Sequence, residues 1–180
     1  MRYTCLLLAL SVIPAVAQPY EIAVTKDAMI VMRDGVKLAA NVYRPARNGA
    51  AANGVFPVLL ERTPYGKDRT GGMKDAEYFV PRGYVVMVQD VRGRYHSEGR
   101  WRPIVDDAND GLETAKWIVA QPWSDGNIGT FGFSYSAATQ HAMAISRAPG
   151  LKTMIPVDAM SNFGRYGVRH NGAFELRWLN

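Results

Sequence analysis

At residues 128–136 the sequence reads Ile128-Gly129-Thr130-Phe131-Gly132-Phe133-Ser134-Tyr135-Ser136. The apolar run up to Phe131 predicts a strand, the small residues around Ser134 predict a sharp turn, and the alanine-rich segment 136–146 predicts a helix. Strand, sharp turn and helix in this order lift a serine above the edge of a sheet. The amide after the serine and the positive end of the helix then face a developing negative charge. We therefore predict that Ser134 is a nucleophile.

The rest of the chain predicts alternating strands and helices. Turn signals lie at Arg33-Asp34-Gly35, where we expect a hairpin, and at Ser124-Asp125-Gly126. The expected strands are 22–32, 36–43, 55–61, 84–89, 128–131 and 153–157, and the expected helices are 75–82, 106–120 and 136–146. Near-continuous apolar runs such as 84–89 are typical of parallel strands covered on both faces. The pattern predicts an α/β fold with a mainly parallel sheet.

The N-terminal residues 1–17 predict a secretory signal peptide. Arg2 precedes an apolar segment from Cys5 to Val16, and Ala15-Val16-Ala17 is typical of a cleavage site. Cleavage after Ala17 removes Cys5, the single cysteine, so we expect a secreted or periplasmic chain without disulfides or a thiolate metal site. The apolar segment is too short to span a bilayer and no later one is long enough, so we expect no stable membrane insertion.

Composition indicates one globular core and argues against a nucleic-acid partner. The chain has 180 residues, of which 48% are hydrophobic, and this is enough for one sizeable core. The formal charge is +5, but the Lys and Arg residues are scattered along the chain rather than clustered. Scattered charge is typical of a solvated surface, so we expect no nucleic-acid binding. No motif indicates a cofactor or a metal, and the oligomeric state stays open.

Three further segments form an ordered series with the serine segment. They are Arg62-Thr63-Pro64-Tyr65-Gly66-Lys67, Asp90-Val91-Arg92-Gly93-Arg94 with Ser97-Glu98-Gly99, and Gln121-Pro122-Trp123-Ser124-Asp125-Gly126-Asn127-Ile128-Gly129. Together they resemble the Xaa-Pro dipeptidyl-peptidase-like (S15) family of α/β-hydrolases, which includes bacterial cocaine esterases and α-amino-acid ester hydrolases. The resemblance runs from about Ile22 to the last residue and implies the α/β-hydrolase fold.

The resemblance implies roles for three residues. Ser134 matches the nucleophile, the backbone N–H of Tyr135 matches one arm of the oxyanion hole, and the hydroxyl of Tyr65 matches the other arm. A phenol on a loop after a central strand can donate to an oxyanion near that edge of the sheet, although a rim tyrosine packed in a turn is the alternative. We expect structural roles for a second group of residues, with loop contacts for Asp90, Arg92, Ser97 and Glu98 and packing for Trp123.

The sequence departs from the family in two places. Ala137 stands where relatives often have glycine, and we expect the helix packing to tolerate this small side chain. Segment 165–169, Arg-Tyr-Gly-Val-Arg, lacks the carboxylate that a similar stretch of the α-amino-acid ester hydrolases supplies for the substrate's amine. This argues against specificity for α-amino substrates.

The acid and base of a catalytic triad are not evident. In α/β-hydrolases they follow the serine. His96 precedes it, His141 lies along the elbow helix, His170 follows at what resembles the start of a cap, and Asp158 is a candidate acid without a clear histidine. The simplest interpretation is that residues 18–160 are the N-terminal part of the hydrolase domain, incomplete at its C-terminus, and that 161–180 begin a helical cap.

These observations predict a serine hydrolase that cleaves carboxylic ester or amide bonds, Xaa-Pro peptides included, through an acyl-Ser134 intermediate. The expected partner is a small-molecule ester, amide or short peptide substrate. Because the acid and base are missing, we expect this chain to be inactive by itself. A β-lactam acylase or α-amino-acid ester hydrolase is one alternative, and a non-catalytic remnant or binding protein is another.

Overall fold

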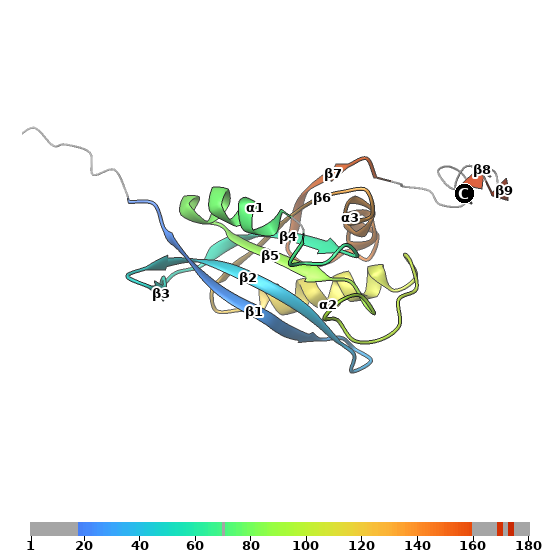
Figure 1. Ribbon diagram of the computed structural model, residues 1–180, viewed down its shortest axis with the longest axis horizontal. Coiled ribbons are helices and arrows are strands. Elements are labelled where there is room, and N and C mark those ends of the chain that lie inside the picture. Colours follow the sequence, from blue (N-terminus) through green and yellow to red (C-terminus); the bar gives the residue numbers. More distant parts are fainter. Residues whose placement is uncertain (1–17, 70, 160–168, 171–172, 175–180) are drawn as a thin grey trace, which may run out of the picture.

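The computed structural model describes residues 18–69, 71–159, 169–170 and 173–174 (Figure 1). The strands of its main sheet are β1 Glu21–Val31, β2 Lys37–Arg47, β3 Ala50–Ala51, β4 Phe56–Thr63, β5 Val85–Asp90, β6 Ser124–Phe133 and β7 Leu151–Val157. The helices are α1 Gly72–Phe79, the 3-10 turn η1 Val80–Arg82, α2 Asp107–Val119 and α3 Tyr135–Ile145. No helix in the described ranges is long and apolar enough to cross a membrane.

The order of strands across the sheet is β1-β2-β5-β4-β6-β7, with β3 paired to β2. The pairs β1–β2 and β2–β5 are antiparallel, whereas β5, β4, β6 and β7 run parallel to one another. This confirms the predicted α/β fold with a mainly parallel sheet. Because neighbouring parallel strands end at the same edge, the loops that follow β4 and β6 begin side by side.

Helices cover both faces of the sheet, as Figure 1 shows for α1 and α2 on opposite sides. Successive side chains of a strand point to opposite faces. In β5, Val85 and Met87 belong to the core cluster that contains residues of α2 and α3, whereas Val86 and Val88 pack with Ala76 of α1. Every residue of β5 is buried, as predicted for a strand with helices on both sides.

The predicted elements are found, with shifted ends. The hairpin at Arg33-Asp34-Gly35 joins β1 to β2, and Gly83 ends the 3-10 turn after α1 with a φ of 88°. The strand predicted to begin at Ile128 begins instead at Ser124. The predicted Ser124-Asp125-Gly126 turn is an irregularity inside β6, where Phe56 pairs with Ser124 and Val58 already pairs with Ile128. Backbone pairing with β4 on both sides of the turn makes it part of the strand.

Two expectations fall largely or wholly outside the described residues. The signal peptide 1–17 lies outside them completely. Within 161–180 the structure describes β8 Arg169–His170 and β9 Ala173–Phe174, which form an antiparallel pair of their own. The start of a helical cap in this segment stays a prediction.

Candidate active site

The turn between β6 and α3 holds Ser134 in a conformation that L residues rarely adopt. Its φ is 56° and its ψ is −116°, and its N–H donates a hydrogen bond of 3.0 Å to the carbonyl oxygen of Val157. Strained backbone of this kind persists where the surrounding structure fixes it, and it is concentrated at functional sites. The side chain is half-buried, so it is accessible from solvent. Ser134 therefore stands at the carboxyl edge of the sheet, before the first turn of α3.

Gly132 makes this turn sterically feasible. Its φ is +144°, and a Cβ at this position would lie 2.6 Å from the Cβ of Ser136. Ser136 and Ala137 in the first turn of α3 are buried, and Ala137 has no exposed surface. The small side chains let strand and helix approach closely, and the alanine at position 137 fits this packing as expected.

Tyr65 lies on the loop after β4, next to the serine turn. Its backbone N–H donates to Oγ1 of Thr63 at 3.1 Å, and its side chain is 46% exposed. The backbone N–H of Tyr135 donates to the hydroxyl oxygen of Tyr65 at 3.3 Å. The structure thus brings the two predicted oxyanion donors together at Tyr135, the residue that follows Ser134. An oxyanion at this point could accept hydrogen bonds from both groups.

A buried ammonium group holds the loop that carries Tyr65. Nζ of Lys67, whose side chain is 1% exposed, lies 2.7 Å from Oδ1 of Asp27 and 2.9 Å from Oδ2 of Asp68. Burial alone would lower the pKa of Lys67, but hydrogen bonds and charge from Asp27 and Asp68 outweigh it and raise the pKa. Asp27 reaches this position from an irregularity in β1, where its φ is 51°. Lys67 is therefore charged and tied to both carboxylates.

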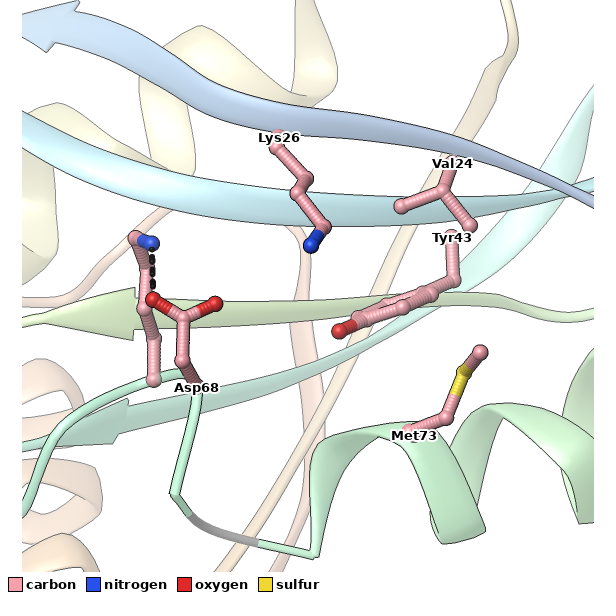
Figure 2. A pocket seen from close by; sticks show the side chains of 6 residues that line it. Val24, Lys26, Tyr43, Asp68 and Met73 are labelled. Atoms are coloured by element: carbon pink, nitrogen blue, oxygen red, sulfur yellow. Dashed lines mark hydrogen bonds and ion pairs between the residues drawn. The ribbon is translucent and has the colours of Figure 1, made fainter.

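The same cluster borders a pocket of about 340 Å³, shown in Figure 2. The ammonium of Lys26 and the phenol of Tyr43 point into it beside the ion pair of Asp68. Its lining consists of Val24, Lys26, Tyr43, Lys67, Asp68 and Met73. None of these residues is among the predicted catalytic ones. The ion pairs of the cluster fix Lys67 and Asp68, which follow Tyr65 in the same loop.

The loop after β5 has the structural role that its sequence predicts. Oδ1 of Asp90 accepts the N–H of Lys67 at 2.7 Å, and the hydroxyl of Ser97 donates to the carbonyl oxygen of Asp90 at 2.7 Å. Burial raises the pKa of Asp90. Arg92 pairs with Asp34 and Asp110, and Glu98 accepts the N–H of Lys37 at 3.0 Å.

Trp123 packs against the core and lies edge-on to Trp117, with 6.0 Å between the ring centroids. The predicted packing role of Trp123 is confirmed.

No candidate acid or base with a described side chain forms a hydrogen bond with the side chain of Ser134. Nδ1 of His96 lies 2.8 Å from Oδ1 of Asp27, in the cluster of Lys67. His141 lies on α3, and His170 belongs to β8. Asp158 directly follows Val157, whose carbonyl oxygen accepts the N–H of Ser134. No hydrogen bond joins the Ser134 hydroxyl to another described residue, so the general base stays unassigned.

Sequence reasoning missed two buried carboxyl groups near the turn. Glu61, in β4, is 7% exposed, and burial raises its pKa. Asp107, the first residue of α2, is 4% exposed and accepts a hydrogen bond from the phenol of Tyr135. A charged residue in an apolar strand was the available signal for Glu61. Nothing local distinguishes Asp107 from the other acidic residues in the first turn of its helix.

Within the described ranges, no group of three or more His, Cys, Asp or Glu side chains is arranged to hold a metal ion.

Comparison with known proteins gives consistent relatives. Residues 34–179 match the family model of the X-Pro dipeptidyl-peptidase (S15 family). Cocaine esterase from Rhodococcus sp. (strain MB1 Bresler) is 42% identical over 147 residues, which cover 79% of this chain and 25% of the relative. A putative Xaa-Pro dipeptidyl-peptidase from Bacillus anthracis is 35% identical over an aligned length of 185 residues, and the alignment covers 78% of this chain and 29% of the relative.

Solved structures agree with these matches. A CocE/NonD family hydrolase from Staphylococcus aureus superposes with a TM-score of 0.72 at 33% identity, covering 82% of this chain and 30% of that one. An α-amino acid ester hydrolase superposes with a TM-score of 0.68 at 30% identity, covering 93% of this chain and 31% of that one. The chain thus spans between a quarter and a third of the length of these relatives.

Proposed function

The chain belongs to the X-Pro dipeptidyl-peptidase (S15) family, and from this membership we propose that it supplies the nucleophile and the oxyanion hole of a serine hydrolase. Its fold is that of the α/β-hydrolases. The proposed reaction is the cleavage of a carboxylic ester or amide through an acyl-Ser134 intermediate. The observation that supports it is the meeting of the Tyr65 hydroxyl and the Tyr135 amide beside a strained serine.

The chemistry follows from these positions. The Ser134 oxygen attacks the substrate carbonyl carbon, and the carbonyl oxygen becomes an oxyanion. The amide of Tyr135 and the phenol of Tyr65 then each donate a hydrogen bond to it, which lowers the energy of the tetrahedral intermediate. The general base, which is not assigned among the described residues, takes the Ser134 proton during the attack and passes it to the departing alcohol or amine. Collapse of the intermediate expels that group and leaves an ester on Ser134, which water hydrolyses to the carboxylic acid and free Ser134. The α3 N-terminus adds its positive dipole end next to the same oxygen.

The test is Ser134→Ala in the full-length protein. A fluorophosphonate probe should label the unmodified protein at Ser134, and the variant should lose both the label and turnover of a chromogenic ester. Loss of a triad nucleophile costs roughly a millionfold in rate. Ser146→Ala, at the other end of α3, is the matched control and should behave as the unmodified protein does. An unlabelled Ser134 in an unmodified, folded protein would favour a non-catalytic remnant or binding protein.

The substrate within this class follows from a panel of related compounds. The relatives carry the names of an esterase, a peptidase and an α-amino acid ester hydrolase, so esters with and without an α-amino group and an Xaa-Pro amide belong in the panel. Segment 165–169 supplies no carboxylate for an amine, so we propose that esters without the amino group are preferred. A kcat/KM at least as high for the α-amino ester would contradict this preference.

The proposed cellular location is outside the cytoplasm, because residues 1–17 have the pattern of a signal peptide. N-terminal sequencing of the protein from its host should give Gln18 as the first residue.

A further inference from the structure

The phenol of Tyr135 is held by two short hydrogen bonds. It donates to Oδ2 of Asp107 at 2.7 Å and accepts the backbone N–H of Ile104 at 2.7 Å. The backbone amide of the same residue is the proposed oxyanion donor. Fixing the ring therefore restrains the orientation of the amide, because the ring is rigid and only two side-chain torsions lie between it and the backbone.

Asp107 is itself anchored to the centre of the sheet. Arg62 in β4, which is 1% exposed, places Nη2 3.5 Å from Oδ1 of Asp107 and donates from Nη1 to its carbonyl oxygen at 2.8 Å. Nε of Arg62 donates to Oε1 of Gln89 in β5 at 2.9 Å. A buried guanidinium requires such partners, because an unpaired buried charge is strongly unfavourable. The acceptor of the Tyr135 phenol is thus fixed by two central strands.

The loop that contains Ile104, whose N–H donates to the phenol, is strained, and it contacts both Tyr135 and the residue before Tyr65. Ile104 has a φ of 70°, an outlier for a β-branched residue. In the same loop, the ring centroid of Trp101 lies 6.2 Å from that of Tyr135. Cζ of the Arg94 guanidinium lies 4.7 Å from the centroid of the Trp101 ring. Nε of Arg94 also donates at 3.1 Å to the carbonyl oxygen of Pro64, the residue before Tyr65.

We propose that the Tyr135 side chain and Asp107 are positioning residues, which hold the Tyr135 amide in the orientation that receives the oxyanion. Through Ile104 and the loop that reaches Pro64, the same contacts restrain the hydroxyl arm at Tyr65. The inference rests on the proposed function, and it assigns roles to two side chains beyond the oxyanion donors themselves.

The phenol acts through the amide and does not touch the substrate. One of its hydrogen-bond partners is a buried carboxylate and the other is a backbone N–H, so its proton and an oxygen lone pair are both engaged. Burial first, and then the charge of Asp107, raise the pKa of Tyr135 well above its ordinary value. The phenol therefore stays protonated and keeps donating to Asp107 at neutral and mildly alkaline pH.

Tyr135→Phe in the full-length protein tests the proposal. It keeps the ring and deletes the two hydrogen bonds. We expect kcat per fluorophosphonate-titrated site to fall about 10- to 100-fold, as is typical when a reacting group is misplaced by a fraction of an ångström to an ångström. KM should change little, and the rate of fluorophosphonate labelling should fall with kcat, because the phosphonyl oxygen occupies the same oxyanion position. Tyr78→Phe is the matched control, because Tyr78 lies on α1 and is exposed to solvent, and it should change none of these values.

Asp107→Asn is the second variant, and it keeps a side-chain oxygen that can accept the hydrogen bond from the Tyr135 phenol. It should lower kcat less than Tyr135→Phe does, with KM unchanged. The double variant should be no slower than Tyr135→Phe alone, because both changes break one chain of contacts. Fully additive losses would contradict this chain.

The outcomes separate the two proposals. If Ser134→Ala keeps its turnover, the proposed function and this inference both fail. If Ser134 is labelled and required, but Tyr135→Phe and Asp107→Asn keep the unmodified kcat per titrated site while unfolding at lower temperature, only this inference is overturned. The phenol would then stabilise the fold without positioning the amide.

Discussion

The hydroxyl oxygen of Tyr65 lies 3.3 Å from the backbone nitrogen of Tyr135, although 70 positions separate the two residues in the sequence. The strands that precede them, β4 and β6, are parallel neighbours, and Leu60 pairs with Thr130. Their carboxyl ends therefore meet at one edge of the sheet. In the structure the amide hydrogen of Tyr135 points at the Tyr65 oxygen. In the proposed reaction the substrate's oxyanion takes the place of this contact and accepts a hydrogen from each group.

Tyr65→Phe should lower kcat by roughly a hundred- to a thousandfold, about 2.7–4 kcal/mol, with KM nearly unchanged. The phenol donates to charge that exists only in the transition state, so substrate binding should hardly change. The side chain is 46% exposed, and Phe keeps its ring, so the folding stability should be preserved. Steady-state kinetics with a chromogenic ester in the full-length protein measure the effect. An unchanged kcat would make Tyr65 a packing residue and leave the second donor to a backbone amide.

Gly132→Ala should destabilise the turn that presents Ser134. The new Cβ would lie 2.6 Å from the Cβ of Ser136, at a backbone φ of +144°. Overpacking and backbone strain of this kind cost about 1–3 kcal/mol each. The melting temperature and the rate of fluorophosphonate labelling should both decrease.

Gly35→Ala is the control for Gly132→Ala. Gly35 also has a positive φ, of +84°, but nothing lies within 4 Å of the position of a Cβ. It should lose less stability and label at the normal rate. Equal losses in the two variants would show that backbone strain alone, without the contact to Ser136, explains the effect.

Glu61→Gln should stabilise the protein at neutral pH and have little effect in acid. Burial raises the pKa of Glu61, so the native state retains a proton that the unfolded state has released. Stability therefore falls as the pH rises from the unfolded pKa through the native one, and each unit of the shift corresponds to about 1.4 kcal/mol. The neutral amide removes this penalty. Melting temperatures at pH 4 and pH 8 measure it, with Glu77→Gln on the exposed side of α1 as the control. A gain that is equal at both pH values would assign the effect to packing.

Lys67→Met should lower the folding stability and make that stability depend less on pH in the acid range. The change deletes the ammonium that pairs with Asp27 and Asp68, and hydrogen bonds to charged groups contribute about 1.5–3 kcal/mol. Hydrogen bonding to Lys67 is the largest influence that lowers the pKa of both carboxyls. Their contribution is present above the unfolded pKa and is lost as the pH falls through the native one, so the variant should lose less stability between pH 6 and pH 3.

Lys26→Met is the control for Lys67→Met, because Lys26 lines the same pocket but is exposed (Figure 2). It should change stability by less than about 0.5 kcal/mol, as is usual for a surface position. A loss as large as that of Lys67→Met would show that the charge of the pocket matters more than the buried ion pairs.

Local patterns in the sequence were sufficient for most of the elements and for the turn that carries the proposed nucleophile, Ser134. The hairpin turn, the buried strand β5 and the strand-turn-helix at Ser134 each depend on residues close together in the chain. Strand and helix periodicities, and the need for a residue without a side chain at Gly132, are properties of such short segments. The ends of elements were less predictable, since Ser124 joins β6 only because Phe56 of β4 pairs with it.

The relationships that position the site arise only in the tertiary structure. The order of strands across the sheet, β1-β2-β5-β4-β6-β7, differs from their order in the chain, and this order brings Tyr65 next to Tyr135. Asp107 looks like any acidic residue at the start of a helix until Arg62 and the Tyr135 phenol contact it. Hydrogen bonds and ion pairs depend on distances of about 3 Å between groups remote in sequence, and no local periodicity encodes those distances. The sequence by itself therefore determined which groups are available for chemistry, and packing of the sheet decided which of them meet.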